Sequence, residues 1–216
     1  MENAVGRVFT PLYRDLLRGD APVPWPIGVL ALLWLGLASF FTYKVLDIES
    51  KAAMILTAGV LTVNVTVSET AASFLQDLDC NMFSLLFAVL AVYCWKKLPW
   101  GAIPGAILLM GSLGIYQGFL TVTIVLVMFV SILALFRGDS FEQVLVRGLR
   151  AVGMVLLGGI LYCLAMKAML SLPGNGIEYQ FLQFSDRDAG IDAPDIAGIH
   201  QGSIRRLVSP NLECLF

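Results

Sequence analysis

The sequence has few charged residues and a single histidine. Lys, Arg, Asp and Glu make up only 14% of the 216 residues, and hydrophobic residues make up 58%. Soluble domains contain about 25% charged and roughly 45–50% apolar residues. The formal net charge of −2 provides no basic surface of the kind that nucleic-acid-binding proteins need. The composition therefore excludes nucleic acid as a partner and indicates an integral membrane protein whose neighbours are lipids.

Motifs for common enzyme chemistries are also lacking. There is no phosphate-binding glycine loop, no zinc-ligand spacing and no hydrolase motif. The alternating carboxylates of 186–192 lack two ligands of a calcium loop, and His200 has no Cys or His neighbour in the sequence. We therefore predict neither a metal site nor a cofactor, and we interpret both features as parts of an exposed loop.

Six apolar segments approach the length of about 20 residues that spans a bilayer. They cover residues 26–46, 52–68, 81–95, 101–116, 118–136 and 151–170. Residues 101–136 carry no charge and would form one helix of about 54 Å, far longer than the ~30 Å hydrocarbon core. The glycine-flanked segment 114–118 is the natural turn. The sequence thus predicts an all-α polytopic membrane protein with about six transmembrane helices.

Interfacial helices are expected on both sides of this domain. In residues 1–24, Thr10 can cap a helix opened by Pro11, with Leu12, Tyr13, Leu16 and Leu17 on its apolar face. A capping-box pattern at 140–143 predicts a second surface helix before the last span. Residues 25–172 then form the transmembrane domain, and the polar residues 173–216 form an extracytoplasmic segment.

The orientation follows from the loop charges. The first, third and fifth loops contain all the basic residues of the short connections: Lys44, Lys51, Lys96, Lys97, Arg137, Arg147 and Arg150. The loops on the opposite side contain none, so the positive-inside rule places them outside the cytoplasm. The N-terminal tail, with Arg7, Arg14 and Arg18, would then also lie outside. We therefore expect a further transmembrane helix upstream of this sequence.

Three carboxylates without a basic neighbour lie in the second loop. Glu69, Asp77 and Asp79 fall within residues 68–80, which contain no Lys or Arg. Uncompensated charge beside a bilayer indicates substrate chemistry. For Asp79 a structural interpretation remains equally open, as the N-cap of the helix that follows.

Two segments resemble one bacterial family. Residues 74–82, Phe-Leu-Gln-Asp-Leu-Asp-Cys-Asn-Met, resemble the F-x-Y-x-x-D-x-x-M pattern of the GtrII-type glucosyltransferases, and 112–117, Ser-Leu-Gly-Ile-Tyr-Gln, resemble that family's s-x-G-I-Y-Q helix end. The resemblance covers about residues 5–172. Gln76 stands where the family has tyrosine, and the family's first helix and outer acidic loop would precede Met1. The resemblance therefore implies a central fragment or an abbreviated relative, which we expect to be inactive by itself.

The resemblance implies a GT-C-like membrane enzyme of the bacterial inner membrane, with its acidic loop in the periplasm. Such enzymes transfer a sugar from a polyprenyl-phosphate donor to a cell-surface glycan such as the O-antigen of lipopolysaccharide. The site residues that it implies are the candidate bases Asp79, Asp77 and Glu69, the phosphate-binding Arg7, Arg14 and Arg18, and the substrate-binding Tyr116 and Gln117.

A non-enzymatic multispanning protein, such as a small transporter or an assembly subunit, is the alternative. Transporters usually carry ionisable residues near the middle of the bilayer. The apolar segments here offer only Asn64 and a few hydroxyl groups, with Lys167 near one end. This pattern weakens the transporter interpretation and leaves an inert subunit open.

Overall fold

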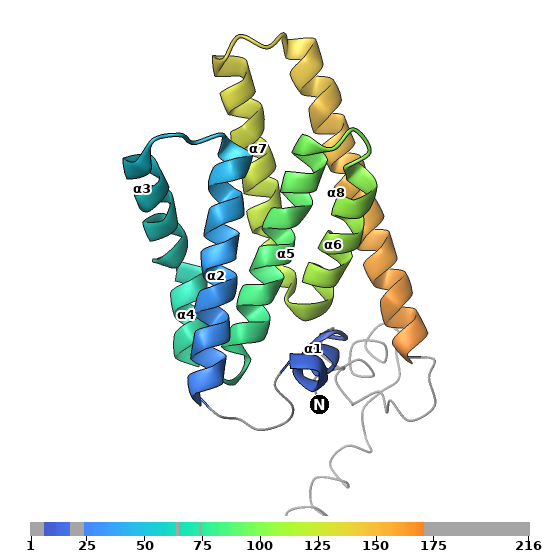
Figure 1. Ribbon diagram of the computed structural model, residues 1–216. Coiled ribbons are helices and arrows are strands. Elements are labelled where there is room, and N and C mark those ends of the chain that lie inside the picture. The colour runs from blue at the N-terminus through green and yellow to red at the C-terminus, as the bar shows by residue number, and fades with distance from the viewer. Residues whose placement is uncertain (1–6, 18–23, 64, 74, 171–216) are drawn as a thin grey trace, which may run out of the picture. The chain divides into compact units, whose positions relative to one another are not determined.

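The computed structural model describes residues 7–17, 24–63, 65–73 and 75–170, all of which belong to one compact unit of residues 1–176. These residues form helices and connecting turns, without a strand (Figure 1). The elements are α1 (Thr10–Leu17), α2 (Pro24–Leu46), α3 (Lys51–Thr62), α4 (Val65–Ser73), η2 (Leu75–Asp77), α5 (Leu78–Lys97), α6 (Ala102–Ile115), η3 (Gln117–Phe119), α7 (Leu120–Phe136) and α8 (Phe141–Leu170). The predictions for residues 173–216, including 186–192 and His200, lie outside the described residues.

Four helical segments are long and apolar enough to cross a bilayer. They are Pro24–Leu46, Leu75–Lys97, Gln117–Phe136 and Phe141–Met169. The helices α3 and α6, with 12 and 14 residues, measure about 18 and 21 Å and fall short of a ~30 Å core. The polytopic helical class is therefore confirmed, whereas the count of six is not.

The prediction of one helix over 52–68 is wrong. The chain breaks between Thr62, where α3 ends, and Val65, where α4 begins. The hydroxyl of Thr62 donates a hydrogen bond to the carbonyl of Gly59 at 2.9 Å, and the backbone N–H of Val63 donates to the same oxygen at 3.0 Å. Such local side-chain bonds compete with the helical ladder and help to end it.

The other local predictions had mixed outcomes. The turn at 114–118 is confirmed, since α6 ends at Ile115 and α7 begins at Leu120. The separate surface helix after Ser140 is wrong, because the same residues open the continuous 30-residue α8. The α1 helix is confirmed, but Thr10 is its first residue and its buried hydroxyl makes no hydrogen bond, so it does not act as the cap.

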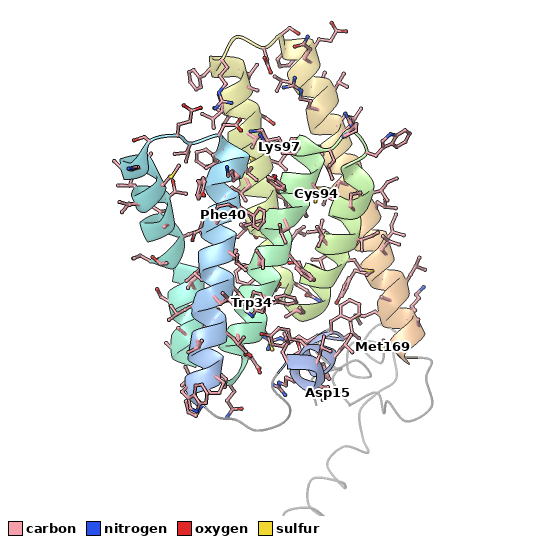
Figure 2. All side chains as sticks on the ribbon, viewed as in Figure 1. Asp15, Trp34, Phe40, Cys94, Lys97 and Met169 are labelled. Carbon is pink, nitrogen blue, oxygen red and sulfur yellow. The ribbon has the colours of Figure 1, made fainter. Side chains whose placement is uncertain are left out.

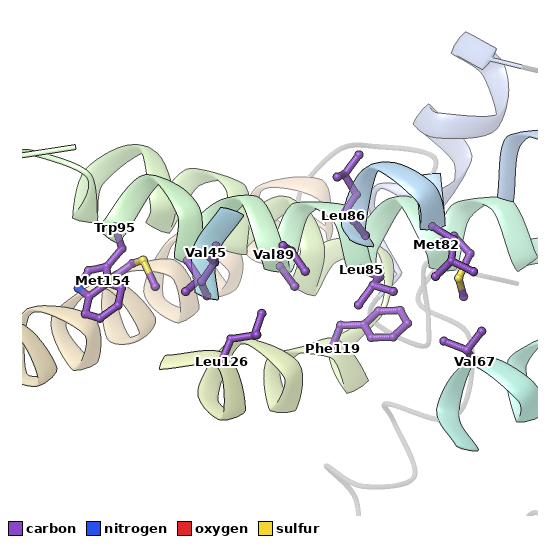
Figure 3. Close-up of a cluster of buried hydrophobic side chains, with 14 of the residues drawn as sticks. Val45, Val67, Met82, Leu85, Leu86, Val89, Trp95, Phe119, Leu126 and Met154 are labelled. Carbon is purple, nitrogen blue, oxygen red and sulfur yellow. The ribbon is translucent and has the colours of Figure 1, made fainter. Parts of the chain in front are cut away.

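The core is built around α5. In the apolar stretch that contains α5, 67% is buried, compared with 17% in the stretches that contain α7 and α8, because α5 contacts α2, α6 and α7. Leu85 and Val89 of α5 pack with Phe119 and with Leu126 of α7 (Figure 3). A helix that is apolar on all sides lies in a protein core or spans a membrane, and α5 does so surrounded by its neighbouring helices.

Small residues allow α5, α6 and α8 to approach closely. The Ser84 hydroxyl donates to the Ser112 carbonyl at 2.9 Å, and the Ser112 hydroxyl donates to the Ser84 carbonyl at 3.0 Å. A Cβ added to Gly105 would lie 2.5 Å from the Met154 sulfur and 2.9 Å from the Ala91 carbonyl oxygen. Small residues and interhelical hydroxyl bonds are typical of helix packing in membranes.

Basic residues gather at one end of this unit, around Asp47. The Asp47 carboxylate accepts hydrogen bonds from Lys96, from Lys97 at 3.0 Å and from Arg137 at 2.9 Å. Burial alone would raise the pKa of Asp47, but these three cations hold it well below its usual range. The ends of α2, α5 and α7 are thereby tied together. Figure 2 labels Lys97 at this end, and Asp15 and Met169 at the opposite end.

Candidate functional site

The candidate site lies where α1 packs against the ends of the long helices, opposite the Asp47 cluster (Figure 1). Tyr13 of α1, Cys80 of α5 and Ile115 of α6 form one buried apolar cluster. The Phe9 backbone N–H donates to the Gly114 carbonyl at 3.0 Å, and the Phe9 ring lies where a Cβ on residue 114 would be, 2.1 Å from the nearest ring carbon. Gly114 is therefore the residue of the Gly-Ile-Tyr-Gln run that allows α1 to dock.

Two arginines meet one carboxylate at this contact. Arg14 donates a hydrogen bond to one oxygen of Asp77, and a guanidinium nitrogen of Arg7 lies 3.7 Å from the other. The three side chains keep 13–22% of their surface exposed, so the group is partly buried but open to solvent. Arg7 lies in the turn before α1 and Arg14 lies within α1, so the helix does not extend back to Arg7, although both side chains reach Asp77.

Tyr116 and Gln117 extend from the neighbouring turn in different directions. The Arg7 guanidinium lies 5.4 Å from the centre of the Tyr116 ring, within cation–π range. The Gln117 amide donates instead to the Tyr162 hydroxyl of α8 at 2.6 Å. Tyr116 thus lies with Arg7, Arg14 and Asp77, which we call the arginine cluster, and Gln117 faces α8.

Asp79 lies directly beneath α1 and is completely buried. It is not the helix N-cap, because that position is Asp77 and Asp79 falls inside the first turn of α5. Burial, partly offset by the hydrogen bond from Trp34 at 2.9 Å, raises the pKa of the Tyr13 hydroxyl, and the charge and hydrogen bond of Asp79 raise it further. A cluster of three polar side chains therefore connects the helices: Tyr13 of α1, Trp34 of α2 and Asp79 of α5.

The structure brings most of the predicted residues together. Arg7 and Arg14 both contact Asp77, Arg7 also lies over the Tyr116 ring, and Asp79 follows Asp77 by two residues at the start of α5. Glu69 is exposed on α4, and among the described residues no interaction joins it to either arginine. Arg18 lies outside the described residues.

Sequence reasoning missed the role of Tyr13 and Trp34. Tyr13 was interpreted only as part of an apolar lipid-facing stripe, whereas it is 4% exposed and its hydroxyl faces polar partners. A buried tyrosine or tryptophan normally needs a partner for its polar atom, and that rule was the available signal. Within the described ranges, no three His, Cys, Asp or Glu side chains are grouped as a metal site would require.

Taken together, the fold and the composition define a multispanning membrane protein with a charged cluster at one end of its helices. The model of the family described as Glucosyl transferase GtrII matches residues 2–214. The chain therefore belongs to the GtrII glucosyltransferase family, and the match extends past the 5–172 region of resemblance to nearly the whole chain. Comparisons with curated proteins and with solved structures found no match.

Proposed function

We propose that this membrane glucosyltransferase transfers glucose from a polyprenyl-phosphate donor to a cell-surface glycan, such as the O-antigen of lipopolysaccharide. Family membership supports the glucosyl chemistry. The observation that carries the donor assignment is the pair Arg7 and Arg14, held side by side on Asp77 at the end of the bundle. A planar guanidinium group can donate two parallel hydrogen bonds to the oxygens of one phosphate. The phosphate of a lipid-linked donor lies at the membrane surface, where this end of the bundle would meet it.

In the proposed reaction, Arg7 and Arg14 bind the phosphate that leaves. The acceptor hydroxyl attacks the anomeric carbon, the bond between that carbon and the phosphate oxygen breaks, and the configuration inverts. The acceptor proton passes to a carboxylate, and the electron pair of the broken bond stays on the phosphate, whose charge the arginines stabilise. Asp77 holds the two guanidinium groups in place for the donor phosphate, whose negative charge increases when the bond to the sugar breaks.

Asp79 is the proposed base. The hydroxyl of Tyr13 interacts with Asp79 and occupies the place that an acceptor hydroxyl would take, so α1 must shift to admit the glycan. Asp77 is already engaged by two cations, and Glu69 is remote from them in the described contacts, which makes both weaker candidates. Tyr116 and Gln117 would line the entrance for the sugar.

The proposed orientation places this site in the periplasm, on the outer face of the bacterial inner membrane. The support is the segregation of charge: Lys96, Lys97 and Arg137 converge on Asp47 at the other end. The positive-inside rule assigns that end to the cytoplasm. A thiol introduced at Ala72, which is exposed near the end of α4, should then be blocked by a membrane-impermeant reagent in intact spheroplasts, and one at the exposed Pro99 should not.

The function is tested in the cells that carry the gene, with each variant introduced at its own locus. Mass spectrometry of the surface glycan should show hexose addition in the wild type and in Asp15→Asn, an exposed carboxylate on α1. Arg14→Gln and Asp79→Asn should lose it. Unchanged glycan in both variants, at equal protein levels in the membrane, would contradict the proposal.

A further inference from the structure

A long apolar groove follows α8, between it and α7 and the end of α6. Two cavities of about 530 and 620 Å³ adjoin there and share Val155 and Leu156 in their walls. The first is bounded by α7, from Ile124 to Ile132, and the second by the end of α6, by η3 and by Leu120. We call these joined cavities the α8 groove. It runs along α8 from Gly148 to Lys167.

The groove is as long as a membrane is thick. Gly148 and Lys167 are about 28 Å apart along the axis of α8, at 1.5 Å per residue, against a ~30 Å hydrocarbon core. Gly148 and Gly159 contribute no side chain to the wall, and a Cβ at either position would have nothing within 4 Å. A phospholipid acyl chain spans only one leaflet, about half of that length. A single occupant of the whole groove must therefore be a longer chain.

Among the residues that line the groove, the charged side chain lies at one end. Lys167 lines it there, together with Gln117 and Tyr162, which are hydrogen-bonded to each other at 2.6 Å. Among the described residues, Lys167 forms no ion pair or hydrogen bond, although it lies on an otherwise apolar helix face. This end is the one at which α1 and the arginine pair lie (Figure 2).

We propose that the α8 groove binds the isoprenoid chain of the lipid-phosphate donor, with Lys167 facing the phosphate end. The inference rests on the proposed function, and it assigns the chain-binding surface that the arginine cluster lacks. One cation at one end and an apolar wall of membrane length fit a single long chain with one anionic head. They fit neither the two chains of a phospholipid nor a second helix of 10–12 Å diameter, which carries no matching anion.

The test is binding, without turnover. The purified protein in liposomes is exposed to a diazirine-bearing polyprenyl monophosphate, and the labelled peptides are identified after irradiation. We expect labels on α8, removed by unlabelled polyprenyl phosphate and retained in excess phosphatidylglycerol. Competition by phosphatidylglycerol, or labels that fall outside α8, would overturn the proposal.

Matched glycine variants locate the chain. Leucine at Gly148 or Gly159 fills the groove and should reduce labelling by at least ~10-fold, because an occupied wall excludes the chain. Gly153→Leu is the control, since Gly153 also has open space around it but lines neither cavity. Equal labelling of Gly148→Leu and Gly153→Leu would show that the occupant does not extend beyond one leaflet, and would refute the assignment.

The charged end is tested at Lys167. Lys167→Gln should weaken binding by about 10-fold, as expected for loss of one charged contact to phosphate, and Lys167→Arg should retain it. Asp79→Asn should still be labelled, which separates this proposal from the function. If wild-type cells show no hexose addition while the purified protein is still labelled, the proposed function alone is refuted. If Gly148→Leu and Lys167→Gln leave hexose addition unchanged, and the probe does not label α8, the groove assignment alone is refuted.

Discussion

Breaking the ion pair between Arg14 and Asp77 should loosen α1 without unfolding the helices beneath it. The pair is hydrogen-bonded and 13–22% exposed, so its contribution lies between that of a surface pair and that of a buried charged bond. Surface pairs contribute about 0.2–1 kcal/mol and charged hydrogen bonds about 1.5–3 kcal/mol. We therefore expect Arg14→Gln to reduce the free energy of α1 docking by about 1–2 kcal/mol, which raises the open population about 5–30-fold.

Cys80 reports this opening, because it is completely buried against Tyr13. With the other cysteines replaced, the rate at which a water-soluble maleimide modifies Cys80 should follow the population in which α1 is undocked. Arg14→Gln should raise that rate by the factor given above. Asp15→Asn, on the exposed face of α1, should leave it unchanged.

Two results would refute this reasoning. Rapid maleimide modification of Cys80 in the protein that keeps Arg14 would mean that α1 does not cover Cys80. If the maleimide reacts with Cys80 equally fast in Arg14→Gln and in the protein that keeps Arg14, the ion pair does not contribute to the docking of α1. A double-mutant cycle with Asp77→Asn should return a coupling energy of about 1–2 kcal/mol.

Further predictions concern the opposite end and the core. Asp47→Asn should reduce the free energy of unfolding in detergent by about 1–3 kcal/mol, more than Asp139→Asn, whose single exposed ion pair contributes less than about 1 kcal/mol. Because the pKa of Asp47 is lowered in the folded state, this contribution is complete above its unfolded pKa of about 3.9 and is lost as the pH falls from there through the lower folded-state pKa. Urea titrations at pH 7 and pH 3 should show the difference between the two variants become smaller at pH 3. Gly105→Leu should overpack the contact with Met154 and destabilise by about 1–3 kcal/mol in the same titration, whereas Gly153→Leu should have almost no effect.

The sequence predicted the membrane class, the turn at 114–118 and the surface helix α1 because each depends on local composition. It failed at two helix boundaries. The apolar run 52–68 satisfies hydropathy, yet the Thr62 hydroxyl bond and the break after it divide the run into two short helices. Asp79 has the residue type of a cap, but the helix begins at Leu78, two residues earlier than that interpretation requires.

The candidate site was predicted in part for the same reason. The proximity of Arg7 and Arg14 in the sequence is a local feature, while their meeting with Asp77, 63 residues beyond Arg14, depends on how α1 and the turn before it dock. The pairing of Gln117 with Tyr162 likewise depends on the packing of α8, which no local pattern specifies. The burial of Tyr13 beside Asp79 could be found only once the helices were assembled.

The central claim is tested most directly by glucose transfer in membranes from the cells that carry the gene, with either labelled polyprenyl-phosphate glucose or a nucleotide-activated glucose as the donor. The account predicts transfer to the surface glycan from the lipid-linked donor. Asp79→Asn should reduce this transfer by at least ~10²-fold, as expected for loss of a general base, and Asp15→Asn should leave it intact. Transfer from the nucleotide sugar when no lipid-linked donor can form, or full activity in Asp79→Asn, would contradict it.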